Sequence, residues 1–77
     1  MALSSVEQWI LQKVVEAGSA GIVELDIASQ LGLEPEEFDT HIDTLLRLGY
    51  IKLVRDNAVR RLRAYRPTAK ATMRLGG

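Results

Sequence analysis

Charged side chains are the residues of this 77-residue chain best suited to chemistry, and they are segregated along it. Residues 1–46 contain nine acidic residues and one basic residue, Lys13, whereas residues 47–77 contain nine basic residues and one acidic residue, Asp56. The two halves therefore carry formal charges of −8 and +8, although the whole chain is neutral. Such asymmetry predicts an anionic partner for the C-terminal half. The alternative is that the two halves neutralise each other within the fold.

The residue types argue against other kinds of chemistry. The chain has no cysteine and a single histidine, His41, so thiolate and histidine-based metal sites are not expected. No serine is accompanied by a base in a pattern typical of a nucleophile, and 77 residues leave little room for a deep pocket. We therefore expect no enzyme activity, no cofactor, no metal and no small-molecule substrate.

The hydropathy pattern and the first residues bear on location. No apolar run approaches the roughly 20 residues that span a bilayer. The first residues lack the basic and then apolar order of a signal peptide. We therefore expect a cytoplasmic protein, or a nuclear one in a eukaryote, without a membrane partner.

The first predicted element is a helix. Ser4 and Glu7 have the spacing of a capping box, in which each residue satisfies a backbone donor of the other, so the helix is expected to begin there. Gly18 is the predicted C-terminal cap. After a short loop, Ile22 and Val23 are enough for no more than a stub of strand.

Two further helices are predicted. The second spans residues 24–31 and is expected to place Leu25, Ala28 and Leu31 on one face. The third spans residues 35–48 and begins with a proline, which suits the first helical turn because its missing N–H costs nothing there. Its buried stripe is predicted at positions with i, i+4, i+7 and i+8 spacing: Phe38, Ile42, Leu45 and Leu46.

The chain then changes to the two-residue period of strands. Residues 50–55 and 59–65 alternate in hydropathy, and Asn57-Ala58 is predicted as a two-residue hairpin loop. In that register the core face pairs Leu53 with Leu62. The other pairs it predicts are Ile51 with Ala64 on the same face, and Lys52 with Arg63 and Val54 with Arg61 on the outer face.

Domain limits follow from where the periodicity stops. Pro67 ends the second strand, and the residues beyond it show no sustained pattern. We therefore predict one domain over residues 4–68 and a flexible C-terminal tail over residues 69–77. The predicted fold class is α+β, mostly α, with three helices followed by a C-terminal β-hairpin.

Over residues 4–68 this order of elements resembles the winged helix-turn-helix superfamily. Residues 21–33 (GIVELDIASQLGL) resemble the helix-turn opening of many winged-helix regulators, and residues 45–51 (LLRLGYI) resemble their third-helix exit. Residues 63–68 (RAYRPT) are similar to the end of the wing in MarR-type and PadR-type regulators. Winged-helix modules of the RNA polymerase III machinery share the general pattern. The resemblance implies double-stranded DNA binding in transcription or its regulation, with the third helix in the major groove.

The predicted DNA-binding site has two parts. On the third helix, Thr40, Thr44 and Arg47 lie opposite the buried stripe and are expected to touch the groove. Glu36 and Asp43 share that face, and their charge opposes phosphate binding. Basic residues facing one another across the hairpin would repel unless an anionic partner offset them. In the wing, phosphates are therefore expected to bind the basic residues Lys52, Arg55, Arg60, Arg61 and Arg63.

A second hypothesis is a protein-interaction winged helix within a larger assembly. Its acidic third helix would dock a basic partner, or its basic wing would dock an acidic one. A second copy of the chain is a further candidate partner. Both hypotheses follow from the same separation of charge, so the sequence alone leaves them open.

Overall fold

The structure, a computed structural model describing residues 2–76, contains the three predicted helices, the predicted short strand and two hairpin strands, of which the second is displaced from its predicted position. The elements in chain order are α1 (Ser5–Ala17), the 3-10 helix η1 (Gly18–Ala20), β1 (Ile22–Val23), α2 (Glu24–Leu31), α3 (Pro35–Arg47), β2 (Ile51–Arg55), the 3-10 helix η2 (Arg60–Leu62), β3 (Ala64–Pro67) and α4 (Ala69–Gly76). The short helices η1 and η2 and the helix α4 are additions to the predicted set.

Helix α1 begins and ends as its sequence predicts. The Ser4 hydroxyl accepts a hydrogen bond from the Glu7 backbone N–H at 3.1 Å, and the Glu7 carboxylate accepts one from the Ser4 N–H at 3.1 Å. This reciprocal pair satisfies two of the orphan donors at the helix start. Gly18 follows the helix with φ +68°, a conformation that side chains with a Cβ rarely adopt.

The Glu7 side chain also joins α1 to α3. Its Oε2 lies 2.7 Å from His41 Nδ1, and both side chains are mostly buried. Burial opposes ionisation of Glu7, but the hydrogen bonds from His41 and Ser4 prevail and lower the pKa of that carboxyl below its usual value of 4.5. His41 therefore links the two helices.

Helix α3 buries the face that its periodicity predicts, whereas α2 does so only in part. Phe38, Ile42 and Leu45 are buried in the core. On α2 the predicted face is correct in part: Ala28 and Leu31 pack against the core, but Leu25 is 49% exposed, and the fully buried residues are Ile27 and Glu24. The helix is rotated so that an acidic residue faces the interior.

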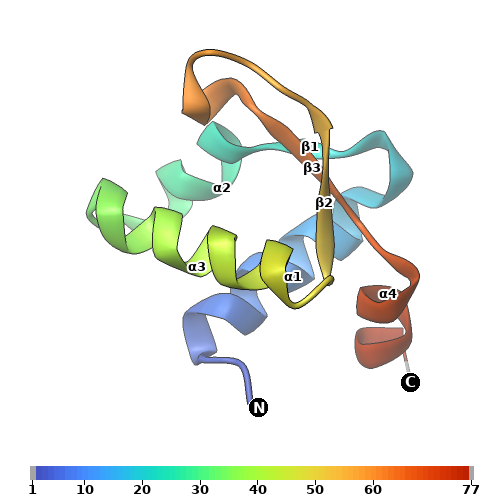
Figure 1. Cartoon of the computed structure of the whole chain (residues 1–77). Helices are drawn as coiled ribbons and strands as arrows, with labels where there is room; N and C mark the ends of the chain where they lie inside the picture. Colours follow the sequence, from blue (N-terminus) through green and yellow to red (C-terminus); the bar gives the residue numbers. More distant parts are fainter. Residues whose placement is uncertain (1, 77) are drawn as a thin grey trace.

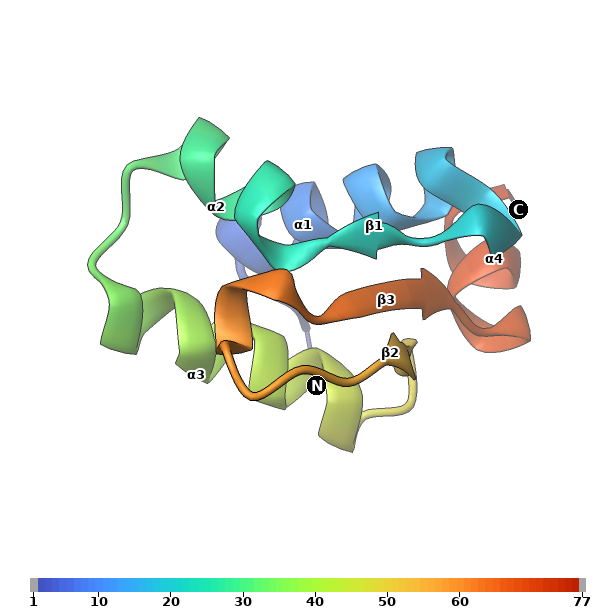
Figure 2. The same cartoon turned by 90° about the horizontal axis from the view of Figure 1, so that it is seen from above.

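The three strands form one antiparallel sheet in the order β1-β3-β2. Helices α2 and α3 lie toward one end of the sheet and α4 lies at the other (Figures 1 and 2). Gly21, with φ +84°, leads into β1 where a Cβ would come within 3.2 Å of the Tyr65 carbonyl oxygen. A side chain at this position would therefore be strained by the positive φ and by this close approach of β1 to β3.

The register of the wing differs from the one predicted. Leu53 pairs with Tyr65, not with Leu62, and Lys52 pairs with Arg66, not with Arg63. The remaining pairs are Ile51 with Pro67 and Arg55 with Ala64, and a bulge at Val54 shifts the ladder between them. Residues 60–62 form η2, so the predicted second strand over residues 59–65 is confined to β3.

Two side chains expected in the core are consequently on the surface. Leu53 is 41% exposed and Leu62 is 44% exposed, whereas Ile51 and Tyr65 are buried. The hydrophobic alternation of the hairpin correctly predicts that strands are present, but it does not predict which residues of the two strands pair. Its register is decided by contacts that the hairpin makes with α2 and α3.

The predicted flexible tail is also corrected over the residues that the structure describes. Residues 69–76 form α4, and Ala71 is completely buried against the core. Lys70 Nζ donates to the Leu48 carbonyl oxygen at 2.6 Å and lies 4.5 Å from the centre of the Tyr50 ring. Helix α4 therefore packs as part of the fold; residue 77 lies outside the described residues.

Replacing Ile51 with alanine tests the register. Ile51 is 2% exposed, so we expect Ile51→Ala to lower the free energy of unfolding by about 2–5 kcal/mol. Leu62→Ala removes a similar volume at an exposed position and should cost less than about 1 kcal/mol. Urea unfolding measures both. Equal losses would instead favour the register in which Leu62 faces the core.

Candidate nucleic-acid interface

A buried carboxylate lies where the wing meets α2. Glu24, the first residue of α2, has no exposed surface. Its Oε2 accepts a hydrogen bond of 2.6 Å from the Tyr65 hydroxyl on β3, and its Oε1 accepts one of 2.5 Å from Arg61 Nη1 on η2. A buried carboxylate is tolerated only when it is paired and hydrogen-bonded. These two bonds therefore hold the wing against α2.

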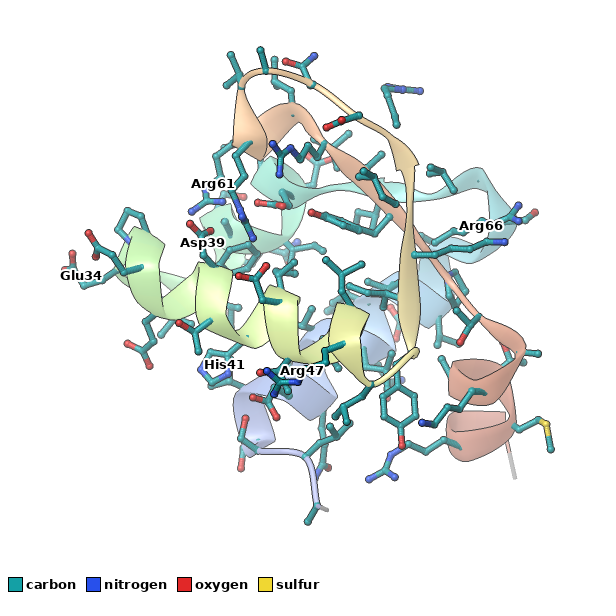
Figure 3. All side chains as sticks on the ribbon, viewed as in Figure 1. Glu34, Asp39, His41, Arg47, Arg61 and Arg66 are labelled. Carbon is teal, nitrogen blue, oxygen red and sulfur yellow. The ribbon has the colours of Figure 1, made fainter. Side chains whose placement is uncertain are left out.

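Arg61 connects this carboxylate to α3. Its Nη1 also lies 2.8 Å from Asp39 Oδ1, and its Nη2 donates to the Pro35 carbonyl oxygen at 3.4 Å. The guanidinium is 5.0 Å from the centre of the Phe38 ring, in cation–π range. Figure 3 shows Arg61 directed from the wing toward Asp39 on α3. One arginine thus joins three elements.

Arg60 makes a parallel set of contacts. Its Nη2 donates to Asp43 Oδ1 at 2.9 Å, and its Nε lies 3.1 Å from Asp39 Oδ1 and 3.6 Å from Glu24 Oε2. Arg60 Nε and Asp39 Oδ1 are buried without a well-oriented hydrogen bond, so their attraction is mainly coulombic. The hydrogen bond to Asp43 and the nearby carboxylates raise the pKa of Arg60 above its usual value, against the opposing effect of burial.

We call this group the wing–helix cluster; its members are Glu24, Asp39, Asp43, Arg60, Arg61 and Tyr65. It contains three carboxylates and two guanidiniums, so its charges nearly cancel. Burial, followed by the hydrogen bond to Glu24 and its negative charge, raises the pKa of the Tyr65 hydroxyl far above 10. Tyr65 therefore stays protonated and acts as a donor throughout the physiological range.

The cluster bears on the two explanations of the charge separation, an anionic partner or neutralisation within the fold. Arg60 and Arg61 were predicted to bind phosphates, but the structure places both against acidic residues of α2 and α3. Arg63 also has partners within the chain: its Nε lies 3.2 Å from Asp56 Oδ1 and donates to the Asn57 carbonyl oxygen at 3.2 Å. The charges of these three arginines are therefore neutralised by carboxylates of the chain itself, as the alternative explanation expected.

The other predicted residues remain on the surface. Thr40 and Thr44 lie on α3, where each hydroxyl donates to the backbone carbonyl four residues earlier at 2.9 Å, and Arg47 is exposed in the last turn. Arg55 is exposed at the end of β2, and no carboxylate of the described residues lies within 4.0 Å of it or of Arg47. Figure 3 shows Arg47 at the end of α3, well separated from Arg66.

Lys52 belongs to a different surface from the rest. It lies directly across the ladder from Arg66 and lines a hollow at the base of the wing. The hollow includes residues of α1, η1, both hairpin strands and α4, and none of α3. The eight predicted residues are therefore dispersed: Thr40, Thr44 and Arg47 lie on α3, Arg60, Arg61 and Arg63 are paired with carboxylates, Arg55 is exposed on the wing, and Lys52 lines this hollow.

Sequence reasoning missed Glu24 and Tyr65, the two buried members of the cluster. A signal for Glu24 was present, because Glu24, Ile27, Ala28 and Leu31 have i, i+3, i+4 and i+7 spacing, the pattern of a buried helix face. An acidic residue on such a face calls for a buried donor elsewhere in the chain.

Two further observations concern metal ions and membranes. Within residues 2–76, no group of histidine, aspartate and glutamate side chains is arranged to hold a metal ion. No helix of that part of the chain is long and apolar enough to cross a membrane.

The Tyr65 hydroxyl provides a test of the cluster. Tyr65→Phe keeps the ring in the core but removes a donor to a buried carboxylate, so we expect a loss of about 1.5–3 kcal/mol in the free energy of unfolding. Tyr50→Phe is the matched control, because its hydroxyl only accepts from Arg74 at 3.2 Å, and its cost should stay below about 1 kcal/mol. Chemical unfolding of both variants measures the difference. Similar losses for the two variants would show that the hydrogen bond to Glu24 stabilises the fold no more than the one between Tyr50 and Arg74 does.

Comparison with known proteins identifies the fold. Neither protein-family models nor curated protein sequences match the chain. Among solved structures, Lactococcus lactis ZitR in its C30AH42A apo form matches 96% of this chain with 23% identity and a TM-score of 0.77. The adhesin competence repressor AdcR from Streptococcus pyogenes matches 96% with 16% identity and a TM-score of 0.77. The chain spans about half the length of these structures, 54% and 52%. It has the winged helix-turn-helix fold.

Proposed function

We propose that this chain is a DNA-binding winged-helix module of a transcription regulator. The fold it shares with a protein described as a repressor supports the proposal, as does the exposure of the α3 face that enters the groove in helix-turn-helix proteins. Nothing in the residue types suggests a reaction, so we propose a binding function without catalysis.

The single observation that carries this proposal is the pairing of α3 acids with wing arginines. Asp39 and Asp43 would repel a phosphate backbone if they were unpaired. Arg60 and Arg61 lie within 3.1 Å of these carboxylates and neutralise much of their charge. The α3 face that otherwise looked unsuited to DNA is thereby made compatible with it.

The proposed contacts follow from what remains accessible. Arg47 at the end of α3 and Arg55 on the wing are exposed, and we assign phosphate contacts to them. Thr40 and Thr44 donate their hydroxyl protons to the helix backbone, so toward a base edge they act as acceptors. Arg63 joins the phosphate contacts if DNA displaces Asp56, which is 74% exposed.

A salt titration of binding to duplex DNA tests the proposal. Fluorescence anisotropy should show affinity that falls steeply with salt, because binding releases counterions from the phosphates. Arg47→Gln and Arg55→Gln should each weaken binding and reduce the slope of log affinity against log salt by about 1.

Lys13→Gln is the matched control. It removes the same charge from α1, where Lys13 pairs with Glu16 at 3.8 Å and stacks on Trp9, and it should leave the slope unchanged. Absence of binding at low salt would contradict the proposal. An equal effect of all three substitutions would show a response to net charge and not to a defined interface.

A protein-interaction module is the second candidate function. It is favoured by apolar side chains exposed on the wing, since Leu53, Val54, Val59 and Leu62 are each more than 40% exposed. If duplex DNA fails to bind at low salt, this second function becomes the better account of the surface.

A further inference from the structure

The base of the wing holds a hollow of about 500 Å³ that the proposed DNA contacts do not use. Its wall is formed by the end of α1, η1, the paired parts of β2 and β3, and the start of α4. A volume of this size lies in the range of small-molecule sites in proteins. No residue of α3 or of the wing tip lines it.

Two cations face this hollow from adjacent strands. Lys52 on β2 and Arg66 on β3 are direct cross-strand partners, so their side chains share one face of the sheet. Neither has a carboxylate of residues 2–76 within 4.0 Å. Arg60, Arg61 and Arg63, in contrast, each have at least one such partner. Like charges facing each other across a ladder destabilise a sheet unless an anion offsets them.

The other lining residues complete a polar site with an apolar side. Ser19 on η1 offers a hydroxyl at the rim, whereas the Thr68 hydroxyl is already donated to the Gly49 carbonyl oxygen at 2.6 Å. Val15 and Pro67 supply apolar surface beside the cations. An arginine fork and a lysine ammonium opposite each other suit the several oxygens of a phosphoryl group.

We propose that this hollow binds a small phosphate monoester through Arg66 and Lys52, with Ser19 as an additional donor. The ester's organic part occupies the volume that a bare phosphate leaves and contacts Val15 and Pro67. Lys52 thereby moves from the predicted DNA contacts to a separate ligand site on the opposite side of the wing base. This site is independent of the proposed DNA binding, and each can fail without the other.

Calorimetric titration of the whole chain with glucose 6-phosphate and with glucose tests the site. The ester should bind saturably at constant ionic strength, and glucose should not. Arg66→Gln should weaken ester binding about 10-fold or more, because it removes a charge-assisted pair of hydrogen bonds. Arg55→Gln, on the same hairpin but outside the hollow, is the matched control and should leave ester binding unchanged.

Measurement of Tm distinguishes loss of the ligand contact from loss of folding in these variants. Without ligand at low salt, Lys52→Gln and Arg66→Gln should each raise Tm, because each removes the repulsion across the ladder. Added ester should raise the Tm of the unmodified chain and of Arg55→Gln, but not of Arg66→Gln. A lower Tm for both hollow variants without ligand would overturn the claim that the two cations repel each other unopposed.

Duplex DNA distinguishes the two sources of a phosphoryl group. Arg66→Gln should leave DNA binding unchanged, whereas Arg55→Gln should weaken it. If Arg66→Gln weakens DNA binding as much as Arg55→Gln does and the ester does not saturate, the hollow takes a backbone phosphate and the small-ligand proposal is overturned. Equal heats from glucose 6-phosphate and glucose would likewise overturn it.

Discussion

Burial of the Glu24 carboxylate is the constraint on which the position of the wing depends. The side chain is completely enclosed, and an unpaired charge there would cost several kcal/mol, on the order of the stability of a small domain. Tyr65 from β3 and Arg61 from η2 are the groups that pair with it. Both must be delivered from one hairpin to one point, so the hairpin has a single position relative to α2. The turn of η2 interrupts the second strand because it brings Arg60 and Arg61 to face the helices.

This arrangement divides seven of the nine basic residues in the C-terminal half into two groups, apart from Lys70 and Arg74 of α4. Arg60, Arg61 and Arg63 are paired with carboxylates and serve the fold. Arg47, Arg55, Lys52 and Arg66 lie outside the cluster and have no carboxylate of the described residues within 4.0 Å. The charge separation along the chain therefore reflects internal neutralisation in part, and it also leaves cations on the surface without a carboxylate partner among the described residues. Part of the acidic charge of α3 is compensated by the wing.

How far the sequence predicted this structure depends on whether the deciding interaction was local. The ends of α1 follow from Ser4, Glu7 and Gly18, and the buried face of α3 follows from its own period; all were predicted correctly. The wing register was wrong because alternation fits several registers equally, and the deciding contact joins residues 41 positions apart, Glu24 and Tyr65. The prediction that Arg60 and Arg61 bind phosphates also depended on non-local contacts. Their acidic partners lie on α2 and α3, far from them in the sequence. Helix α4 was not predicted because its eight residues are too few to show a helical hydrophobic period. Its place in the fold is evident only from the burial of Ala71 against the core.

A double-mutant cycle between Glu24 and Arg61 tests the central claim most directly. Glu24→Gln keeps the side-chain volume, Arg61→Gln keeps a shorter polar side chain, and urea unfolding gives the free energy of unfolding of each variant and of the double variant. If the pair holds the wing to α2, the two losses are not additive, and the coupling energy is at least about 1 kcal/mol. Losses that add to within about 0.5 kcal/mol would contradict the account, because the wing would then be positioned without this pair.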